Sequence, residues 1–258
     1  MIRRVVFNQK GGVGKSSIAV NLAAVSAQQG LKTLLIDLDV QGNASQYVMG
    51  AHAARPGTEV FFQNQLNLYA REPLATLIHE THFAGLSIMP SGPGLLELEH
   101  KLESRYKMYK LREALDTLLG QFDRIYLDTP PALNFFSRSA LIAADDVLVP
   151  FDCDRFAVHA LHQLTMNFDE IRADHNPSLR LAAVIPNQVP ARASLPRTLI
   201  ASLVADGYPV TETLLPPSVV MRESHELSKP LVFSHPNHRL THAFQALHAK
   251  SLDWKSVV

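Results

Sequence analysis

Short apolar runs that end in polar or acidic residues recur along this chain. They lie at residues 5–7, 31–39, 86–89, 121–128, 145–150 and 179–187. Runs of this length without strict alternation are typical of buried parallel strands, and helical segments separate them. The order of elements predicts an α/β protein with a mostly parallel twisted sheet and helices on both faces.

The helical segments are defined by their apolar spacing. Residues 18–25, 157–173 and 240–247 have the spacing of helices, and a stripe at positions 95, 98, 102, 106, 109, 115 and 118 predicts helix from Leu95 through Leu119. Residues 51–85 are less regular. We expect surface helices and loops there, with a turn at Pro56-Gly57 and a helix around Leu74 to His79.

The chain has 258 residues, of which 47% are hydrophobic and 19% charged. This length is enough for a sizeable core, and the composition is ordinary for a globular protein. No repeat, low-complexity run or flexible linker is visible, so we expect residues 1–258 to form a single domain.

The first apolar run leads into a glycine-rich stretch, Asn8-Gln9-Lys10-Gly11-Gly12-Val13-Gly14-Lys15-Ser16-Ser17, and then into a helical segment. A strand, a glycine-rich turn and a helix start form a cradle for phosphate, because backbone N–H groups and the positive helix end face one anion. Lys15 would neutralise the β- and γ-phosphates, and the Ser16 hydroxyl would bind Mg²⁺. The simpler alternative is a glycine-rich turn with incidental lysines.

The general phosphate-loop pattern requires a glycine where this chain has Gln9, and this chain has an additional lysine at Lys10. The stretch from Lys10 to Ser16 thereby resembles the deviant Walker A motif of the ParA/MinD family of P-loop ATPases. The resemblance implies a P-loop NTPase fold, with Gly11 to Ser17 around the phosphates, Lys15 as the lysine of the same subunit, and Lys10 reaching the nucleotide of a partner subunit.

Two acids close the second apolar run. The segment Asp37-Leu38-Asp39-Val40-Gln41-Gly42-Asn43 is similar to the second motif of the family, with Val40 where proline is usual. By this resemblance Asp39 orients the attacking water and Asp37 supports the magnesium ion from a distance. The alternative is a pair of strand-end acids that caps the next helix.

A third acid, Asp128, ends the run before Thr129-Pro130-Pro131. The prolines stop the strand, and an acid at this place can hold Mg²⁺ through water. The segment resembles the switch of the family that senses the γ-phosphate, over Thr129 to Ala132.

Base contacts are expected further along. Asn187 ends the run at 179–187, and Pro216 lies in Leu214-Leu215-Pro216-Pro217. Both resemble adenine-pocket positions of the family. Asp152-Cys153-Asp154 departs from the usual Gln-x-Glu of the family, and we expect Cys153, the one cysteine, to be a small buried residue without reactive character.

The resemblance implies an ATPase that binds ATP or ADP with Mg²⁺, forms a homodimer in the ATP state and hydrolyses slowly until a partner protein stimulates it. Lys10, Lys15 and Asp39 are its catalytic candidates, and Ser16, Asp37 and Asp128 its metal candidates. Such proteins position or segregate a cargo.

Two kinds of surface are candidates for binding by the ATP dimer, namely DNA and a membrane. The net charge is 0, so nucleic-acid binding would need a local patch, and basic residues do occur after Pro186: Arg192, Arg197, Arg222, Lys229 and Arg239. Nonspecific DNA is the leading expectation, although Pro216-Pro217-Ser218-Val219-Val220 lacks the arginines common in DNA-binding members.

A MinD-like membrane switch is the alternative, and the short tail Lys250–Lys255 makes it less favoured. An iron–sulfur role would need more than Cys153. No signal peptide or membrane span is visible, so we expect a cytoplasmic protein, and DNA binding would place it at the nucleoid.

Overall fold

The computed structural model describes the chain except residues 51–54, 68–71, 191–193 and 252–258 and the side chain of Arg155. A seven-stranded sheet has the order β3-β4-β2-β5-β1-β6-β7. All neighbouring strands are parallel except β3 and β4. The strands are β1 (Ile2–Val6), β2 (Thr33–Asp37), β3 (His79–Glu80), β4 (Leu86–Met89), β5 (Arg124–Asp128), β6 (Asp146–Asp152) and β7 (Arg180–Asn187).

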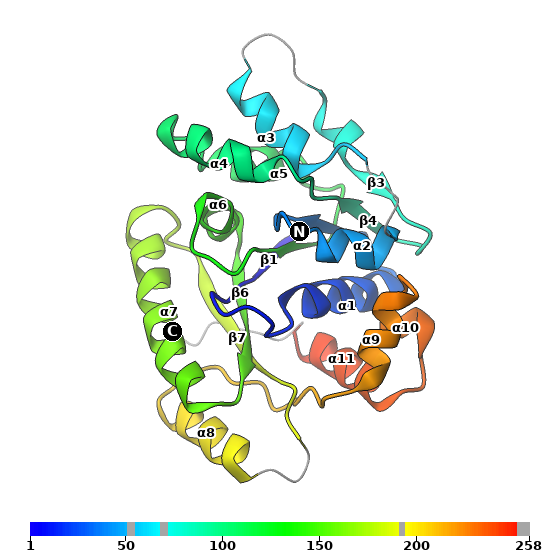
Figure 1. Ribbon diagram of the computed structural model, residues 1–258, viewed down its shortest axis with the longest axis vertical. Helices are drawn as coiled ribbons and strands as arrows, with labels where there is room; N and C mark the ends of the chain where they lie inside the picture. The colour runs from blue at the N-terminus through cyan, green and yellow to red at the C-terminus, as the bar shows by residue number, and fades with distance from the viewer. Residues whose placement is uncertain (51–54, 68–71, 191–193, 252–258) are drawn as a thin grey trace.

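Helices cover both faces of the sheet (Figure 1). The helices are α1 (Lys15–Gln28), α2 (Asn43–Met49), α3 (Thr58–Leu66), the 3₁₀ helix η1 (Leu74–Leu77), α4 (Leu95–Ser104), α5 (Lys110–Asp116), α6 (Phe135–Ala143), α7 (Arg155–Asp174), α8 (Ser194–Ala205), α9 (Val219–Glu226), α10 (Leu231–Ser234) and α11 (Arg239–Lys250). This arrangement confirms the predicted α/β fold class. A single domain over residues 1–258 stays a prediction, because part of that range lies outside the described residues.

Alternate strand residues pack on opposite faces. In β1, Val5 contributes to the core beneath α3–α8, whereas Val6 contributes to the core beneath α1, α2 and α9–α11. Because both faces are covered, strand residues of either parity are buried, which explains the continuous apolar runs in the sequence.

Because β1, β2 and β5 are parallel, their carboxyl ends lie at the same edge of the sheet. Asp37 of β2 pairs with Asp128 of β5, and Val6 of β1 pairs with the same Asp128. The phosphate loop follows β1 directly, so the loop and both acids meet at this edge, where ligands of open α/β sheets bind.

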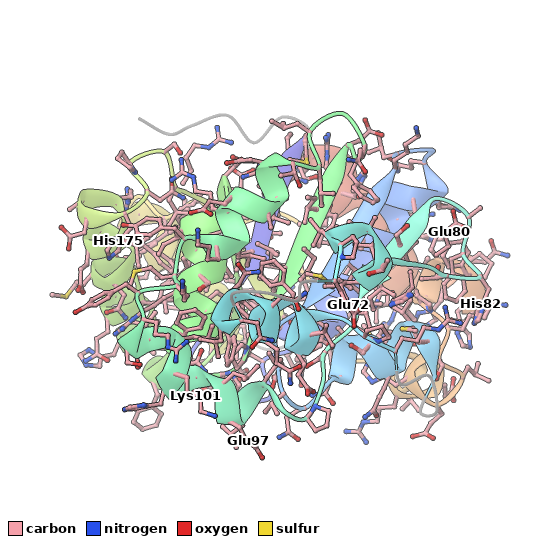
Figure 2. The ribbon with its side chains drawn as sticks, turned by 90° about the horizontal axis from the view of Figure 1, so that it is seen from above. Glu72, Glu80, His82, Glu97, Lys101 and His175 are labelled. Atoms are coloured by element: carbon pink, nitrogen blue, oxygen red, sulfur yellow. The ribbon has the colours of Figure 1, made fainter. Side chains whose placement is uncertain are left out.

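The predicted helix from Leu95 through Leu119 is wrong as one element. It is two helices, α4 and α5, separated by a turn in which Tyr106 has a left-handed backbone with φ of 53°. Tyr106 is 82% exposed, so the stripe positions 106 and 109 do not continue the buried face of α4. The charged residues Glu97 and Lys101 of α4 point outward (Figure 2).

The segment at 51–85 also differs from its prediction. The helix expected around Leu74 to His79 is the short η1 followed by β3. Helix α3 is not a surface helix throughout, because Phe61 and Phe62 are buried in the core. At the predicted Pro-Gly turn the chain bends at Pro56 just before α3, and a β carbon on Gly57 would lie 2.0 Å from the carbonyl oxygen of Pro90.

Candidate active site

The loop between β1 and α1 has the conformation of a phosphate cradle. Gly12 and Gly14 have φ of 75° and 89°, a region that favours glycine, and Gly14 directly precedes α1. A β carbon on Gly14 would lie 2.4 Å from Nδ2 of Asn187, so the close approach also requires glycine. The loop therefore presents backbone and the α1 N-terminus to the cavity beside it.

Lys15 begins α1 and is almost fully buried. Its ammonium donates a hydrogen bond to the carbonyl oxygen of Lys10, at 3.0 Å, across the loop. Burial lowers the pKa of Lys15, and the charges of Asp128 and Asp39 oppose that shift. The ammonium thus lies at the loop interior, facing the acids at the ends of β2 and β5.

Asp128 is fully buried, and neither of its carboxylate oxygens has a hydrogen-bond partner among the described residues. Burial, followed by the charge of Asp37, raises the pKa of Asp128 well above its ordinary value, while Ser16 and Lys15 act in the opposite direction. Unsatisfied buried carboxylate oxygens are rare and call for a cation. The residues present therefore fit Mg²⁺, with Asp128 and the Ser16 hydroxyl on its side of the loop.

Asp37 is also fully buried, but its oxygens are engaged. Oδ1 accepts the amide of Asp39 at 3.1 Å, and Oδ2 accepts the amide and hydroxyl of Ser45 at 2.8 and 2.7 Å. Burial raises the pKa of Asp37 to about 6, and these hydrogen bonds oppose the shift. Such an acid is suited to support a metal site indirectly.

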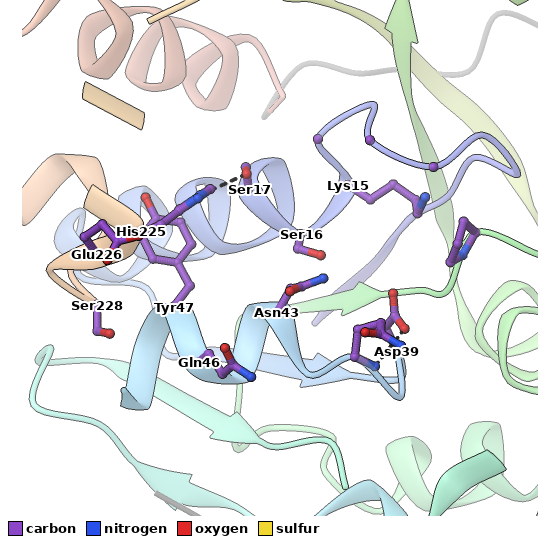
Figure 3. A pocket seen from close by; sticks show the side chains of 15 residues that line it. Lys15, Ser16, Ser17, Asp39, Asn43, Gln46, Tyr47, His225, Glu226 and Ser228 are labelled. Atoms are coloured by element: carbon purple, nitrogen blue, oxygen red, sulfur yellow. Dashed lines mark hydrogen bonds between the residues drawn. The ribbon is translucent and has the colours of Figure 1, made fainter. Parts of the chain in front are cut away.

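Asp39 lies just beyond β2 and lines the same cavity as Lys15 and Ser16 (Figure 3). Its Oδ1 accepts the amide of Gln41 at 3.0 Å, and its carbonyl oxygen accepts the hydroxyl of Ser91 at 2.6 Å. These hydrogen bonds fix the backbone around Asp39, and its carboxylate lies on the cavity that Lys15 and Ser16 also line.

Lys10 is directed elsewhere. Its ammonium forms ion pairs with Asp152 and Asp154 at 2.8 and 2.7 Å, and the side chain is 39% exposed. These two carboxylates raise the pKa of Lys10. The two lysines of the loop therefore point in different directions. The ammonium of Lys15 lies inside the loop, whereas that of Lys10 lies at the end of β6.

Two adjoining cavities lie along the loop. The phosphate-side cavity, of about 580 Å³, is lined by the loop together with Asp39, Tyr47, Pro131 and His225. The base-side cavity, of about 570 Å³, is lined by Asn187, Pro216, Met221 and Phe244 among others. Gly12, Gly14, Ser17 and His225 line both.

Asn187 and Pro216, the predicted base contacts, lie together on the base-side cavity. The amide of Asn187 also donates to the carbonyl oxygen of Val13 at 2.8 Å, so it ties β7 to the phosphate loop. Cys153 is half-buried, and burial raises its pKa to about 11, in agreement with an unreactive thiol.

Several residues at the site were not identified from the sequence. Ser45 and Tyr47 come from α2, and His225 comes from α9. Asp152 is the last residue of β6, and Asp154 directly precedes α7. The acids at 152 and 154 were visible as a departure from the family pattern, but their pairing with Lys10 spans 142 and 144 positions of sequence. No local pattern predicts such a contact.

Comparison with known proteins agrees with this geometry. A family model described as "AAA domain" matches residues 3–181. The chromosome partitioning protein ParA of Myxococcus xanthus is 33% identical over 88% of this chain and 79% of its own length. The chromosome-partitioning ATPase Soj of Thermus thermophilus is 34% identical over 95% of this chain and 94% of its own.

Solved structures give the same fold. The cobyrinic acid a,c-diamide synthase of Mycobacterium smegmatis, with bound ATP analogue and magnesium, superposes with a TM-score of 0.83 at 26% identity, over 99% of this chain and 96% of that chain. The MinD cell division ATPase of Pyrococcus furiosus has a TM-score of 0.79 at 19% identity, over 99% of this chain and 100% of that chain. Its likeness concerns the fold alone.

The structure brings the sequence motifs together at one edge of the sheet: the phosphate loop with its two lysines, and the acids at the carboxyl ends of β2 and β5. Relatives above 30% identity also align over most of the chain. The chain belongs to the ParA/MinD family of deviant Walker A P-loop ATPases.

Proposed function

We propose that the protein is a Mg²⁺-dependent ATPase that dimerises in the ATP state and acts as a switch, positioning or segregating a cargo. A partner protein accelerates its slow hydrolysis. The observation that carries this proposal is the unpartnered, buried carboxylate of Asp128 beside Lys15 at the phosphate loop. Such an arrangement supports the binding of a phosphate–metal pair, since each charge then has a countercharge.

Each residue has one task in the proposed site. The amides of Gly11 to Ser17 and the α1 N-terminus bind the phosphates, and Lys15 holds the β- and γ-phosphate oxygens. Ser16 and Asp128 hold Mg²⁺, which when bound neutralises charge developing on the transferred phosphate, and Asp37 supports this shell indirectly. Asp39 orients the attacking water, and Asn187 and Pro216 hold the adenine.

The proposed need for a second subunit follows from the charges at the cavity. Among the described residues that line the phosphate-side cavity, Lys15 is the only lysine or arginine. Phosphoryl transfer requires countercharge on the oxygens, and a cation supplied in trans commonly completes such sites. Lys10 lies in the same loop with its side chain partly exposed at the surface, so in the dimer it would reach the nucleotide of the partner subunit.

Two loop variants test the proposal. Lys15→Ala should abolish ATP binding, because it removes the cation buried in the cradle. Lys10→Ala should retain binding within a few fold and lose ATP-dependent dimerisation. Nucleotide affinity by calorimetry and mass by analytical ultracentrifugation, with ADP and with a non-hydrolysable ATP analogue, separate the two effects. A Lys10→Ala protein that dimerises like the wild type would refute the trans role.

A further inference from the structure

His225 lies where the two cavities meet. Its ring nitrogen Nε2 is 3.1 Å from the hydroxyl oxygen of Ser17, and the ring packs edge-on against Tyr47 with centroids 4.3 Å apart (Figure 3). Ser17 belongs to α1 and His225 to α9, so the contact joins segments 208 positions apart. The family motifs considered above include neither this histidine nor its contact.

The position of His225 determines which part of a nucleotide it would meet. Lys15 and Asp39 line only the phosphate-side cavity, and Asn187 and Pro216 line only the base-side cavity. Ser17 and His225 line both, beside Gly12 and Gly14. A nucleotide that extends from one cavity to the other must pass them with its sugar and the phosphate next to the sugar.

We infer that His225 is a nucleotide-positioning residue, which orients the Ser17 hydroxyl toward the phosphate nearest the sugar. The inference rests on the nucleotide binding proposed above, and it adds a residue of the C-terminal segment to that site.

The hydrogen-bonding capacity of the two groups explains how the positioning works. A phosphate oxygen only accepts, so the Ser17 hydroxyl must donate its single proton to it. The hydroxyl oxygen can then accept from His225, provided that Nε2 carries the proton. The Nε2–H tautomer thus leaves the hydroxyl proton free for the ligand, whereas the other tautomer would draw it away.

Several contacts hold α9, and with it the imidazole, in place. The hydroxyl groups of Tyr47 and Ser224 lie 2.6 Å apart, and the amide of Asn21 donates to the Tyr47 hydroxyl at 3.1 Å. The oxygen of the same Asn21 side chain accepts the amide of Leu231 at 2.9 Å. Partial desolvation lowers the pKa of His225, opposed by Glu226, so the ring is neutral at pH 7.5 and above.

The test compares nucleotide affinities of full-length variants. His225→Phe keeps an aromatic ring against Tyr47 but cannot donate, His225→Gln retains an amide donor, and Ser17→Ala removes the hydroxyl. His242→Phe makes the same change at an exposed position of α11 that lines neither cavity. Dissociation constants for ADP and for a non-hydrolysable ATP analogue are measured by calorimetry with Mg²⁺, and unfolding temperatures without nucleotide show whether each variant folds.

We expect His225→Phe to weaken both nucleotides by about fivefold, the usual effect of one lost hydrogen bond. ADP and the ATP analogue should be affected equally, since both contain the phosphate next to the sugar. His225→Gln should restore part of the affinity, and His242→Phe should bind like the wild type. Because His225 acts through Ser17, the double variant should bind no more weakly than Ser17→Ala.

Two results would overturn the inference: affinity of His225→Phe within twofold of the wild type, or losses that multiply in the double variant. Neither result would contradict the proposed function, because the wild type would still bind nucleotide and Lys15→Ala would not. A wild type that binds neither nucleotide would overturn both.

Discussion

Asp128 is a buried acid whose carboxylate oxygens have no hydrogen-bond partner among the described residues. Without a cation, an ionised carboxylate in this place destabilises the fold, and the raised pKa of Asp128 expresses that penalty. In the proposed site, the burial of Asp128 would lower the stability of the ligand-free protein and provide a ligand for Mg²⁺.

Asp128→Asn should therefore raise the stability of the nucleotide-free protein by about 1–3 kcal/mol, because the amide removes the buried charge. The same variant should lose most of the stabilisation that Mg²⁺ and ADP together give the wild type. Thermal unfolding with and without these ligands measures both effects. A variant that is less stable than the wild type without ligand would contradict the role assigned to Asp128.

His248 of α11 is fully buried, and neither ring nitrogen has a hydrogen-bond partner among the described residues. Burial, followed by the charges of Arg4 and Arg124, lowers its pKa from 6.5 to about 4. Between these values the unfolded chain binds a proton that the folded chain does not. The free energy of unfolding should therefore fall as the pH falls from 6.5 to 4.

His248→Leu should remove this contribution, which amounts to up to about 3 kcal/mol across the window. Asp37, with its raised pKa of about 6, acts in the opposite direction, since its folded form binds protons more readily. The quantity to compare is thus the difference between variant and wild type in urea unfolding at pH 4.5 and 7.5. A difference that does not change with pH would show that His248 does not titrate as inferred.

Helix α7 and the phosphate loop are joined at their ends. The Oδ1 atom of Asp154 caps α7 by accepting the amide of Ala157 at 2.7 Å, and its Oδ2 atom pairs with Lys10. Asp152, at the end of β6, supplies the second pair. In the proposed dimer, Lys10 would have to leave both carboxylates before it reached the other subunit, so this junction would oppose dimerisation.

Asp152→Asn should weaken that restraint and tighten the dimer formed with a non-hydrolysable ATP analogue by about threefold. The effect is small because the pair is partly exposed. Asp154→Asn should behave similarly, since asparagine keeps the cap on α7. Sedimentation velocity over a range of protein concentrations gives the dimer constants. Unchanged or weaker dimers in both variants would mean that the pairs do not restrain Lys10.

Elements differ in how far the sequence predicted them. The strands at the centre of the sheet and the acids at their ends were predictable, because buried parallel strands and the phosphate loop depend on local patterns. The break after α4 was not, since Tyr106 fits the apolar spacing and only its left-handed backbone removes it from the buried face. His225 and Asp152 gain their significance from distant partners, Ser17 and Lys10.

At the scale of the whole molecule, the balance of charge bears on the surface to which the protein would bind. With a net charge of 0, any attraction to DNA would depend on exposed basic residues of the C-terminal segment, including Arg222, Lys229 and Arg239. Arg192 and the tail from residue 252 lie outside the described residues. No helix among the described residues is long and apolar enough to cross a membrane, and Leu240, Phe244 and Leu247 of α11 are buried in the core.

Asp39→Ala should trap the ATP-bound dimer, which doubles the basic surface. This protein should co-sediment with DNA in ATP but not in ADP, and added salt should weaken the binding. Lys229→Ala together with Arg239→Ala should reduce it several fold. The same protein is tested in parallel with anionic liposomes. If it co-sediments with liposomes and not with DNA, the binding surface is a membrane and the DNA prediction is wrong.

A closed ring of hydrogen bonds surrounds Asp39. Asp37 accepts from Ser45 and from the amide of Asp39, the Ser45 hydroxyl accepts the amide of Ser91, and the Ser91 hydroxyl donates to the carbonyl of Asp39. Two uncharged serines, Ser45 of α2 and Ser91 of the segment after β4, thus hold the backbone of the acid that we propose orients the water. In a screen of random variants, Ser45 and Ser91 should tolerate replacement as poorly as the acids, although neither would touch the nucleotide.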